Sequence, residues 1–141
     1  MNGGIGGHAG LFSNANDLAV IMQMLLNKGV YGGQRYLNQA TIEEFTRCQS
    51  CINNIRRGIG FDKPEMNYSK TGPTCKCVAA ESFGHTGFTG TIAWADPVKN
   101  VVYIFLSNRV HPSADNKKIN DLATRVQVQE AIYDILAMAG S

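Results

Sequence analysis

Apolar residues recur at helical spacing in two stretches of the chain, one near each end. In the first stretch the spacing i, i+3, i+4, i+7 and i+8 predicts a helix over residues 13–29 with one apolar stripe facing a core. Ser13, Asn14 or Asn16 can cap the start of this helix, and Gly29 can end it. The stripe consists of Leu18, Ile21, Met22, Leu25 and Leu26.

The second stretch predicts a C-terminal helix over residues 116–138. Between the two helices, the Tyr-Gly-Gly of residues 31–33 predicts a turn. A short helix over residues 40–48 should follow, because Thr41 and Glu44 have the spacing of a capping box. The apolar side of the C-terminal helix would carry Ile119, Leu122, Val126, Ile132 and Leu136.

The pattern changes to strands after residue 81. Residues 91–95 and 101–106 are rich in β-branched and aromatic side chains, and the turn-forming residues 96–100 separate them. The second run is continuously apolar, which predicts a strand buried on both faces. With the segment around His85, these strands form an antiparallel three-stranded meander flanked by helices, so the fold class is α+β.

Residues 49–80 lack a regular pattern, apart from a short strand-like piece at residues 58–61. A loop of this length inside a compact domain usually carries function or is poorly ordered, so we expect it to border the functional site. The chain is thus organised as one partial domain over residues 1–141. Its parts are a helical part (1–48), an irregular loop (49–80), antiparallel strands (81–112) and a C-terminal helix (113–141).

Charge and composition exclude some partners. The 141 residues carry 13 Lys and Arg against 11 Asp and Glu, and these basic residues are scattered, which does not favour nucleic acid or an anionic membrane surface. No apolar run approaches the ~20 residues of a membrane-spanning helix. The N-terminus lacks the pattern of a signal peptide. The glycine-rich residues 3–10 run directly into a helix start, which favours a chain cut from a longer polypeptide.

The four cysteines could be in any of three states. Cys48 and Cys51 form one close pair, and Cys75 and Cys77 form another. Two thiolate pairs could hold a structural zinc ion, although the second pair is tighter than the usual ligand spacing. Disulfides and free thiols are the remaining two states, and together they outweigh zinc. We therefore expect no metal and no other cofactor.

The stretch ESFGHTGFTGT, residues 81–91, is the best candidate for chemistry. A strand that opens with His85-Thr86-Gly87 places small residues where a ligand's backbone could pair with an exposed sheet edge. The backbone N–H just after Gly87 could face a developing oxyanion. A purely structural interpretation is a glycine bulge with a surface or hydrogen-bonded histidine, and short Gly/Thr motifs often arise without function.

The same stretch, followed by WADPVKNVVYIFLSNRVHP and an amphipathic helix, resembles the C-terminal part of the class C β-lactamase and penicillin-binding-protein family of serine hydrolases. GGIGGHAGLFSNANDLAVIMQMLLNKG is similar to a helix of that family. The resemblance covers nearly the whole chain and is weakest over residues 49–80. It is greatest to a Bacteroidetes form in which this domain follows a family-three β-N-acetylglucosaminidase domain.

The resemblance implies a role for each matched residue. His85 would stand in the place of the family's Lys-Thr-Gly or His-Thr-Gly residue, orienting the general base or holding a substrate carboxylate. The N–H of Phe88 would form half of the oxyanion hole, and Thr86, Gly87 and Thr89 would line the strand edge that pairs with substrate. Asn108 and Arg109 would lie near the substrate-carboxylate end of the cleft, although a lone arginine is as often a surface ion pair.

A histidine instead of a lysine removes the fixed charge that would hold a β-lactam carboxylate at neutral pH, because histidine titrates near pH 6.5. The resemblance therefore implies a D-alanyl peptidase or esterase acting on peptidoglycan peptides rather than a true β-lactamase. It also implies a periplasmic or cell-envelope location. A second hypothesis is a non-catalytic domain that binds cell-wall peptide and positions an attached glycosidase.

We expect two of the family's motifs, Ser-x-x-Lys and Tyr-x-Asn, to be missing. No serine is followed three residues later by lysine, so the nucleophile of an acyl-enzyme is not in this chain. The literal Lys-Thr-Gly of residues 70–72 precedes a proline and has no strand pattern, so we reject it. The chain alone should be inactive and should need the upstream part of its polypeptide. Missing sheet and helices would also favour self-association, which light scattering can test.

Overall fold

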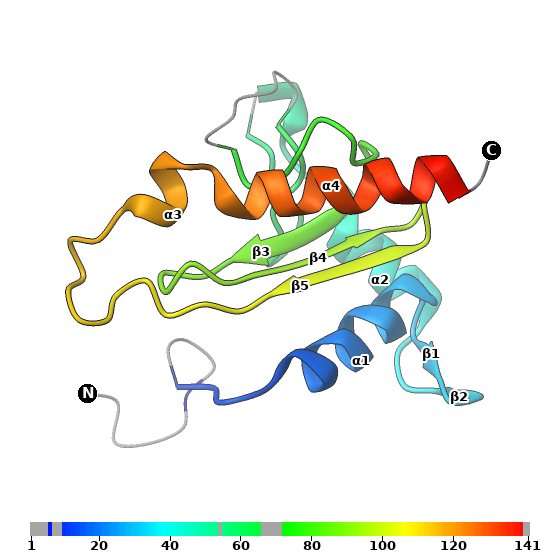
Figure 1. Ribbon diagram of the computed structural model, residues 1–141. Helices are drawn as coiled ribbons and strands as arrows, with labels where there is room; N and C mark the ends of the chain where they lie inside the picture. Colours follow the sequence, from blue (N-terminus) through cyan, green and yellow to red (C-terminus); the bar gives the residue numbers. More distant parts are fainter. Residues whose placement is uncertain (1–5, 7–9, 54, 66–71, 140–141) are drawn as a thin grey trace.

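The computed structural model describes residue 6 and residues 10–53, 55–65 and 72–139. These form the expected α+β arrangement around an antiparallel sheet of three strands in the order β3-β4-β5. The sheet lies between helix α1 on one face and helix α4 on the other (Figure 1). The bounds are Ala15–Leu26 for α1, Phe83–Thr86 for β3, Ile92–Asp96 for β4, Val101–Phe105 for β5 and Thr124–Ala139 for α4.

The first helix and the turn after it confirm the sequence prediction. Asn14 is the cap, because its side chain accepts a hydrogen bond from the backbone N–H of Asp17. The helix ends earlier than predicted, at Leu26 with Asn27 as its C-cap, and Lys28 (φ +54°) and Gly29 (φ +90°) follow in the left-handed region. The hairpin β1 (Val30–Tyr31) and β2 (Gln34–Arg35) turns through Gly32 and Gly33, which both have positive φ.

The next helix, α2 (Gln39–Thr46), forms where expected but without the predicted capping box. Its N-cap is Asn38, which makes no side-chain capping hydrogen bond. Thr41 and Glu44 therefore lie inside the helix rather than at its start, because the helix begins at Gln39.

The predicted C-terminal helix is divided in two. Helix α3 (Lys118–Asp121) and helix α4 are separated by Leu122 and Ala123, and Ala123 has a φ of +50°. The predicted apolar stripe is confirmed only in part: Val126 is buried, whereas Leu122 is 63% exposed and Leu136 is 47% exposed. No helix in the described part of the chain is long and apolar enough to cross a membrane. The buried residues of α4 are Val126, Gln129 and Tyr133.

Polar contacts explain why α4 buries this face. The Tyr133 hydroxyl donates to Asp96 Oδ2 at 2.9 Å, and the backbone N–H of Cys75 donates to Gln129 Oε1 at 2.9 Å. Burial and the Asp96 carboxylate together raise the pKa of Tyr133. These side chains, rather than the most apolar ones, point inward and satisfy buried polar groups, and Gln129 Nε2 is left without a hydrogen-bond partner in the described chain.

The two faces of the sheet carry separate cores. Phe83 and Ala95 pack against Met22 of α1, whereas Trp94 and Tyr103 belong to the cluster on the other face. The expectation that the last strand is buried on both faces is wrong, because Tyr103 is the only fully buried residue of β5. The physical reason is its place at an edge of the sheet, whereas β4 occupies the centre.

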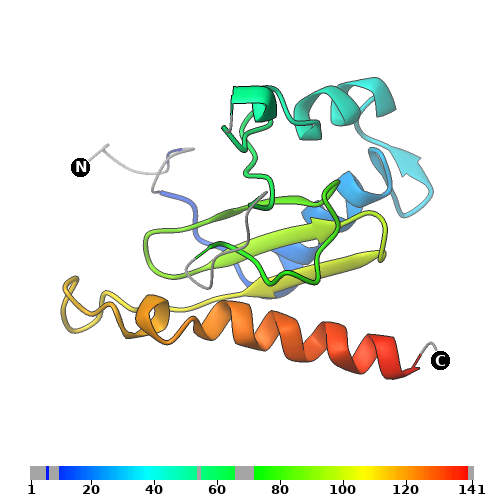
Figure 2. The ribbon, with the colours of Figure 1, turned by 90° about the horizontal axis from the view of Figure 1, so that it is seen from above.

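Residues 49–65 are irregular, as predicted, but they are tied to the sheet. A short 3-10 helix, η1 (Cys51–Asn53), is followed by an isolated antiparallel bridge between Arg57 and Asp62. The strand-like piece predicted at residues 58–61 is instead a bend inside this bridge. Asp62 also bridges to Gly84, so this segment meets the outer edge of β3 (Figure 2).

The buried Lys63 should make the free energy of unfolding depend on pH. It is 5% exposed, and burial lowers its pKa from 10.5 to about 8. Because the folded pKa is depressed, the unfolded chain binds more protons between pH 8 and 10.5. The free energy of unfolding should therefore rise across this window, by at most about 3 kcal/mol. Lys63→Met should abolish the rise, as urea denaturation at several pH values would show.

The matched control for this experiment is Lys99→Met, because Lys99 is exposed in the turn between β4 and β5. The variant at Lys99 should keep the full rise in unfolding free energy. An equal rise in the Lys63→Met variant would contradict the assignment of the pH dependence to the buried ammonium group.

Candidate active site

The outer edge of β3 is the part of the predicted site that is most clearly formed. The N–H of Asp62 donates to the carbonyl of Gly84 at 2.7 Å, and the N–H of Gly84 donates to the carbonyl of Asp62 at 3.2 Å. The backbone groups of Gly84 therefore point away from β4. Because these directions alternate along a strand, the N–H and C=O of Thr86 also point outward. The ladder bond from Gly87 N–H to the Thr91 carbonyl, 2.9 Å, fits this alternation.

The His-Thr-Gly motif lies at the end of β3 and not at its start, which corrects the predicted position. The strand begins at Phe83 and ends at Thr86. A tight turn follows, in which the N–H of Gly90 donates to the carbonyl of Gly87 at 2.9 Å. Gly90 has φ +92°, and the hydroxyl of Ser107 would lie 2.6 Å from an added Cβ, so both its conformation and its surroundings require glycine.

Phe88 is the first central residue of this turn. Its side chain is 74% exposed, and its N–H makes no hydrogen bond to another residue of the described chain. A free N–H beside an exposed strand end can donate to a ligand's oxygen. The structure therefore leaves available the donor that the sequence predicts for half of an oxyanion hole.

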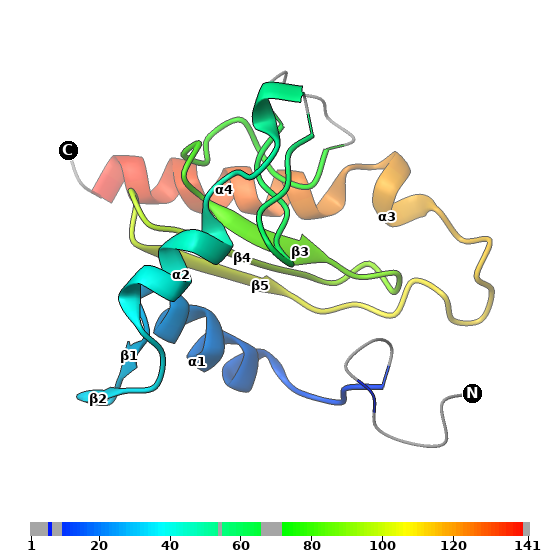
Figure 3. The ribbon, with the colours of Figure 1, turned by 180° about the vertical axis from the view of Figure 1, so that it is seen from behind.

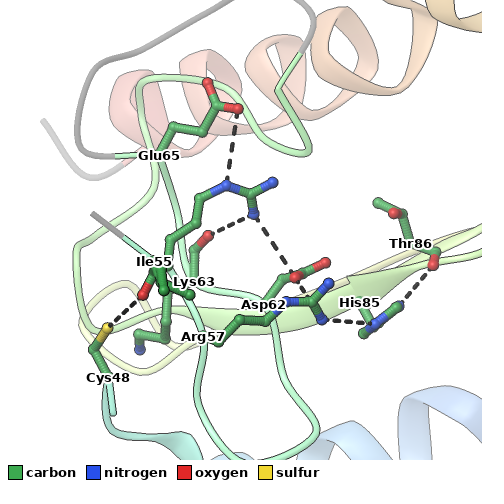
Figure 4. A network of polar contacts seen from close by, with 9 residues as sticks. Cys48, Ile55, Arg57, Asp62, Lys63, Glu65, His85 and Thr86 are labelled. Atoms are coloured by element: carbon green, nitrogen blue, oxygen red, sulfur yellow. Dashed lines mark hydrogen bonds and ion pairs between the residues drawn. The ribbon is translucent and has the colours of Figure 1, made fainter. Parts of the chain in front are cut away.

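His85 is held by two neighbours rather than projecting freely (Figure 4). Its Nδ1 lies 2.7 Å from the carbonyl oxygen of Thr86, and its Nε2 lies 3.2 Å from Nη1 of Arg57. A carbonyl can only accept and a guanidinium can only donate, so Nδ1 carries the proton and Nε2 accepts. In this arrangement both nitrogens of the imidazole are engaged.

Arg57 is in turn held by a buried carboxylate. Its Nη1 lies 2.9 Å from Oδ1 of Asp62, a residue that is 5% exposed. The contact is an ion pair but is not aligned as a hydrogen bond, which leaves Asp62 Oδ1 without a hydrogen-bond partner in the described chain. Nη1 of Arg56 lies 3.8 Å from the same oxygen. Two guanidinium groups therefore surround one buried carboxylate beside His85.

Arg109 contacts the β3–β4 turn. Its Nε donates to the carbonyl of Phe88 at 2.8 Å, and its guanidinium carbon lies 4.6 Å from the centre of the Phe88 ring. Its Nη1 donates to the carbonyls of Ala114 and Asn116, both at 2.9 Å. These bonds connect the turn to residues 114–116, so Arg109 positions the turn that carries the Phe88 N–H.

The other predicted binding residues lie around the same turn. The carbonyl of Thr89 accepts hydrogen bonds from the Arg109 N–H at 3.0 Å and from the Ser107 hydroxyl at 2.9 Å. Asn108 and Arg109 line a shallow hollow of about 350 Å³ together with residues of α3 and its flanks. The structure brings these residues together at one end of the sheet, with His85 on the preceding strand.

Sequence reasoning missed Arg57 and Asp62. Both lie in the irregular segment 49–80, for which the sequence predicts a place beside the site but offers no motif. The sequence pattern that could have indicated them is the Arg-Arg pair at residues 56–57 close to an acidic residue, and this pattern is weak. The bridge between Asp62 and Gly84 brings these residues to His85.

The cysteines are paired as disulfides, which decides among the three states that the sequence left open. Cys48 is bonded to Cys51, and Cys75 is bonded to Cys77. Among the described residues no cluster of three or more His, Cys, Asp or Glu side chains could hold a metal ion.

One literal Tyr-x-Asn does occur, Tyr36-Leu37-Asn38, and corrects the expectation that this spacing is absent. The structure gives it a local role: the Tyr36 N–H donates to the carbonyl of Gly29 at 2.8 Å, and Asn38 is the N-cap of α2. It follows the β1–β2 hairpin, at the opposite end of the sheet from the β3–β4 turn (Figure 3). The rejected Lys-Thr-Gly of residues 70–72 lies mostly outside the described residues.

Known proteins match this chain over most of its length. A protein from Salmonella paratyphi B named "Putative D-alanyl-D-alanine carboxypeptidase" is 40% identical over 119 residues, which is 84% of this chain and 27% of the relative. Proteins of the same name from Salmonella newport and Salmonella enteritidis match equally well. The chain thus spans about a quarter of the length of these relatives, as the 27% shows.

The family assignment rests on a still longer match. The family described as Beta-lactamase matches residues 1–127. This match includes α1, the whole sheet and the His-Thr-Gly strand end, so it covers the elements that form the candidate site. The chain therefore belongs to the beta-lactamase family, and its three-stranded sheet with flanking helices is part of a beta-lactamase-like fold.

Proposed function

We propose that this chain is the C-terminal part of a serine hydrolase that cleaves amide or ester bonds of cell-wall peptides through an acyl-enzyme, with D-alanyl carboxypeptidase activity. Family membership and the names of the relatives support the reaction class. The observation that carries the proposal is the exposed end of β3, where Thr86 presents outward backbone groups and the Phe88 N–H is free of partners in the described chain.

In this proposal each residue of the strand end has a distinct role. The Phe88 N–H donates to the oxyanion of the tetrahedral intermediate, which stabilises charge that develops only in the transition state. The outward backbone of Thr86 pairs with the substrate peptide as an added strand would. Gly87 and Thr89 line the same edge, Asn108 lies beside the hollow, and His85 forms the wall next to the reacting groups.

The nucleophile must come from another part of the polypeptide. No Ser-x-x-Lys occurs in these 141 residues, and the relatives are much longer than this chain. We propose that an upstream segment supplies the serine, the lysine and the second oxyanion donor. We also propose a periplasmic or cell-envelope location, where peptidoglycan peptides are found. The resemblance to the Bacteroidetes form supports a preceding β-N-acetylglucosaminidase domain, which the sequence upstream of residue 1 would verify or refute.

Covalent labelling tests the acyl-enzyme. A fluorescent penicillin or a fluorophosphonate, read by intact mass, should label the full-length protein once and should not label the 141-residue chain. The reason is that acyl transfer has no first step without the serine and its base. Absence of label on the full-length protein would contradict the proposal and would favour a domain that binds cell-wall peptide without cleaving it.

A further inference from the structure

We propose that Arg57 is a specificity-determining residue that binds the carboxylate at the leaving end of the substrate, beside the end of β3. This inference rests on the proposed function. It assigns a role to a residue outside the His-Thr-Gly motif, in the irregular segment that precedes the strand. The motif alone lacks a fixed charge, and Arg57 supplies one in direct contact with its histidine.

The guanidinium of Arg57 is fixed in place before any substrate arrives. Its Nη1 is 2.9 Å from the buried Oδ1 of Asp62 and 3.2 Å from Nε2 of His85. Asp62 is itself fixed, because its backbone pairs with Gly84 on the outer edge of β3. The cation is thus attached to the strand edge that would bind the peptide. A binding group that is already ordered loses less entropy when its ligand binds.

The remaining donors of Arg57 are unpaired in the described part of the chain. The contacts with His85 and Asp62 both use Nη1, and neither Nε nor Nη2 has a partner among the described residues. The side chain is 53% exposed, so a ligand can reach these atoms. Two N–H groups of one guanidinium match the two oxygens of a carboxylate, and such paired contacts are stronger and more directional than those of an ammonium group.

The neighbouring cations are already committed to the protein. Arg109 donates to the carbonyls of Phe88, Ala114 and Asn116 and holds the turn. The Nζ of buried Lys63 donates to the carbonyl of Glu81 at 2.7 Å. Among the described residues, Arg57 is the cation that contacts the histidine of the motif, and its Nε and Nη2 have no partner there.

Peptide geometry brings a carboxylate to this region. In a substrate that ends in D-Ala-D-Ala, a single residue separates the scissile carbonyl from the terminal carboxylate, and one extended residue spans about 3.3–3.6 Å. A scissile carbonyl held by the Phe88 N–H therefore places the terminal carboxylate close to the end of β3. A peptide that runs back along the outer edge of the strand would present it beside His85 and Arg57.

The test compares an N-acetylated peptide ending in D-Ala-D-Ala with the same peptide ending in a carboxamide, using the full-length protein. The measured quantity is the ratio of the two kcat/KM values, which is independent of the fraction of protein that is correctly folded. We expect the wild type to prefer the acid by roughly tenfold or more, because charge-assisted hydrogen bonds are lost with the amide. Arg57→Gln should bring the ratio near one, and Arg57→Lys should retain an intermediate preference.

Arg56→Gln is the matched control. Arg56 adjoins Arg57 and lies 3.8 Å from the same Asp62 oxygen, but the structure records no contact with His85. This variant removes an equal charge and should keep the wild-type preference. An unchanged ratio in Arg57→Gln, or an equal fall of the ratio in both variants, would overturn the role of Arg57 alone. Hydrolysis of neither peptide by the wild type would overturn the proposed function, and the inference with it.

Discussion

Replacing His85 with alanine in the full-length protein should lower kcat/KM for the D-Ala-D-Ala peptide by at least about 100-fold. The structure supplies two reasons for this expectation. The imidazole occupies the space beside the outward backbone of Thr86 and connects its carbonyl to the Arg57 guanidinium. Its loss would remove one contact from each of these groups, and misplacement of about 1 Å can be enough to cost two orders of magnitude in rate.

His111→Ala is the matched control, because His111 is exposed in the loop after Asn108 and, among the described residues, contributes only its backbone N–H to a hydrogen bond. It should keep wild-type kinetics. Unchanged turnover in the His85→Ala variant would reject His85 as a residue of the active site. His85→Asn adds a graded comparison, because its amide could donate to the Thr86 carbonyl but lacks the shape of the imidazole.

The elements governed by local sequence could be predicted. The cap at Asn14, the positive φ of Gly29 and the two glycines of the β1–β2 turn each depend on residues within a few positions. Strand β4 follows from its β-branched and aromatic content. These features need no knowledge of distant contacts, which is why periodicity and turn chemistry identify them.

The failures have a common physical origin in tertiary contacts. Which face of α4 is buried depends on a break at Ala123 and on polar partners such as Asp96, 37 residues before Tyr133 in the chain. Periodicity counts apolar side chains and therefore ranks Leu122 above the buried Gln129. The partial burial of β5 likewise follows from its edge position, which the pattern of a single strand does not contain.

In the candidate site, too, local sequence could predict some residues, whereas tertiary contacts determine the place of others. The strand end from His85 to Phe88 could be predicted, because the motif is contiguous and resembles that of a known family. Arg57 and Asp62 could not, because 28 residues separate Arg57 from His85 and the pairing of Asp62 with Gly84 brings them together. The bonds of Arg109 to three carbonyls likewise depend on the fold, because they join the β3–β4 turn to residues 114–116.

Gly84→Ala should lower the free energy of unfolding by about 3 kcal/mol or more, which is the upper range for overpacking a core. An added Cβ would overlap the carbonyl oxygen of Ala93 and would lie 2.5 Å from Cε3 of Trp94, whose side chain is 1% exposed. Backbone of the central strand and a buried indole cannot move aside cheaply. Urea denaturation of the 141-residue chain would measure the change.

Gly60→Ala separates this steric effect from the general cost of replacing glycine. Gly60 has φ +77° and no atom within 4 Å of an added Cβ, so only the strained backbone should contribute, at about 1 kcal/mol. A loss at Gly84 no greater than that at Gly60 would contradict the close approach of β3 to Trp94. A larger loss at Gly84 would show that glycine is required one residue before His85. The Trp94 indole packs over Gly84, and this contact fixes strand β3, whose outer edge carries the candidate site.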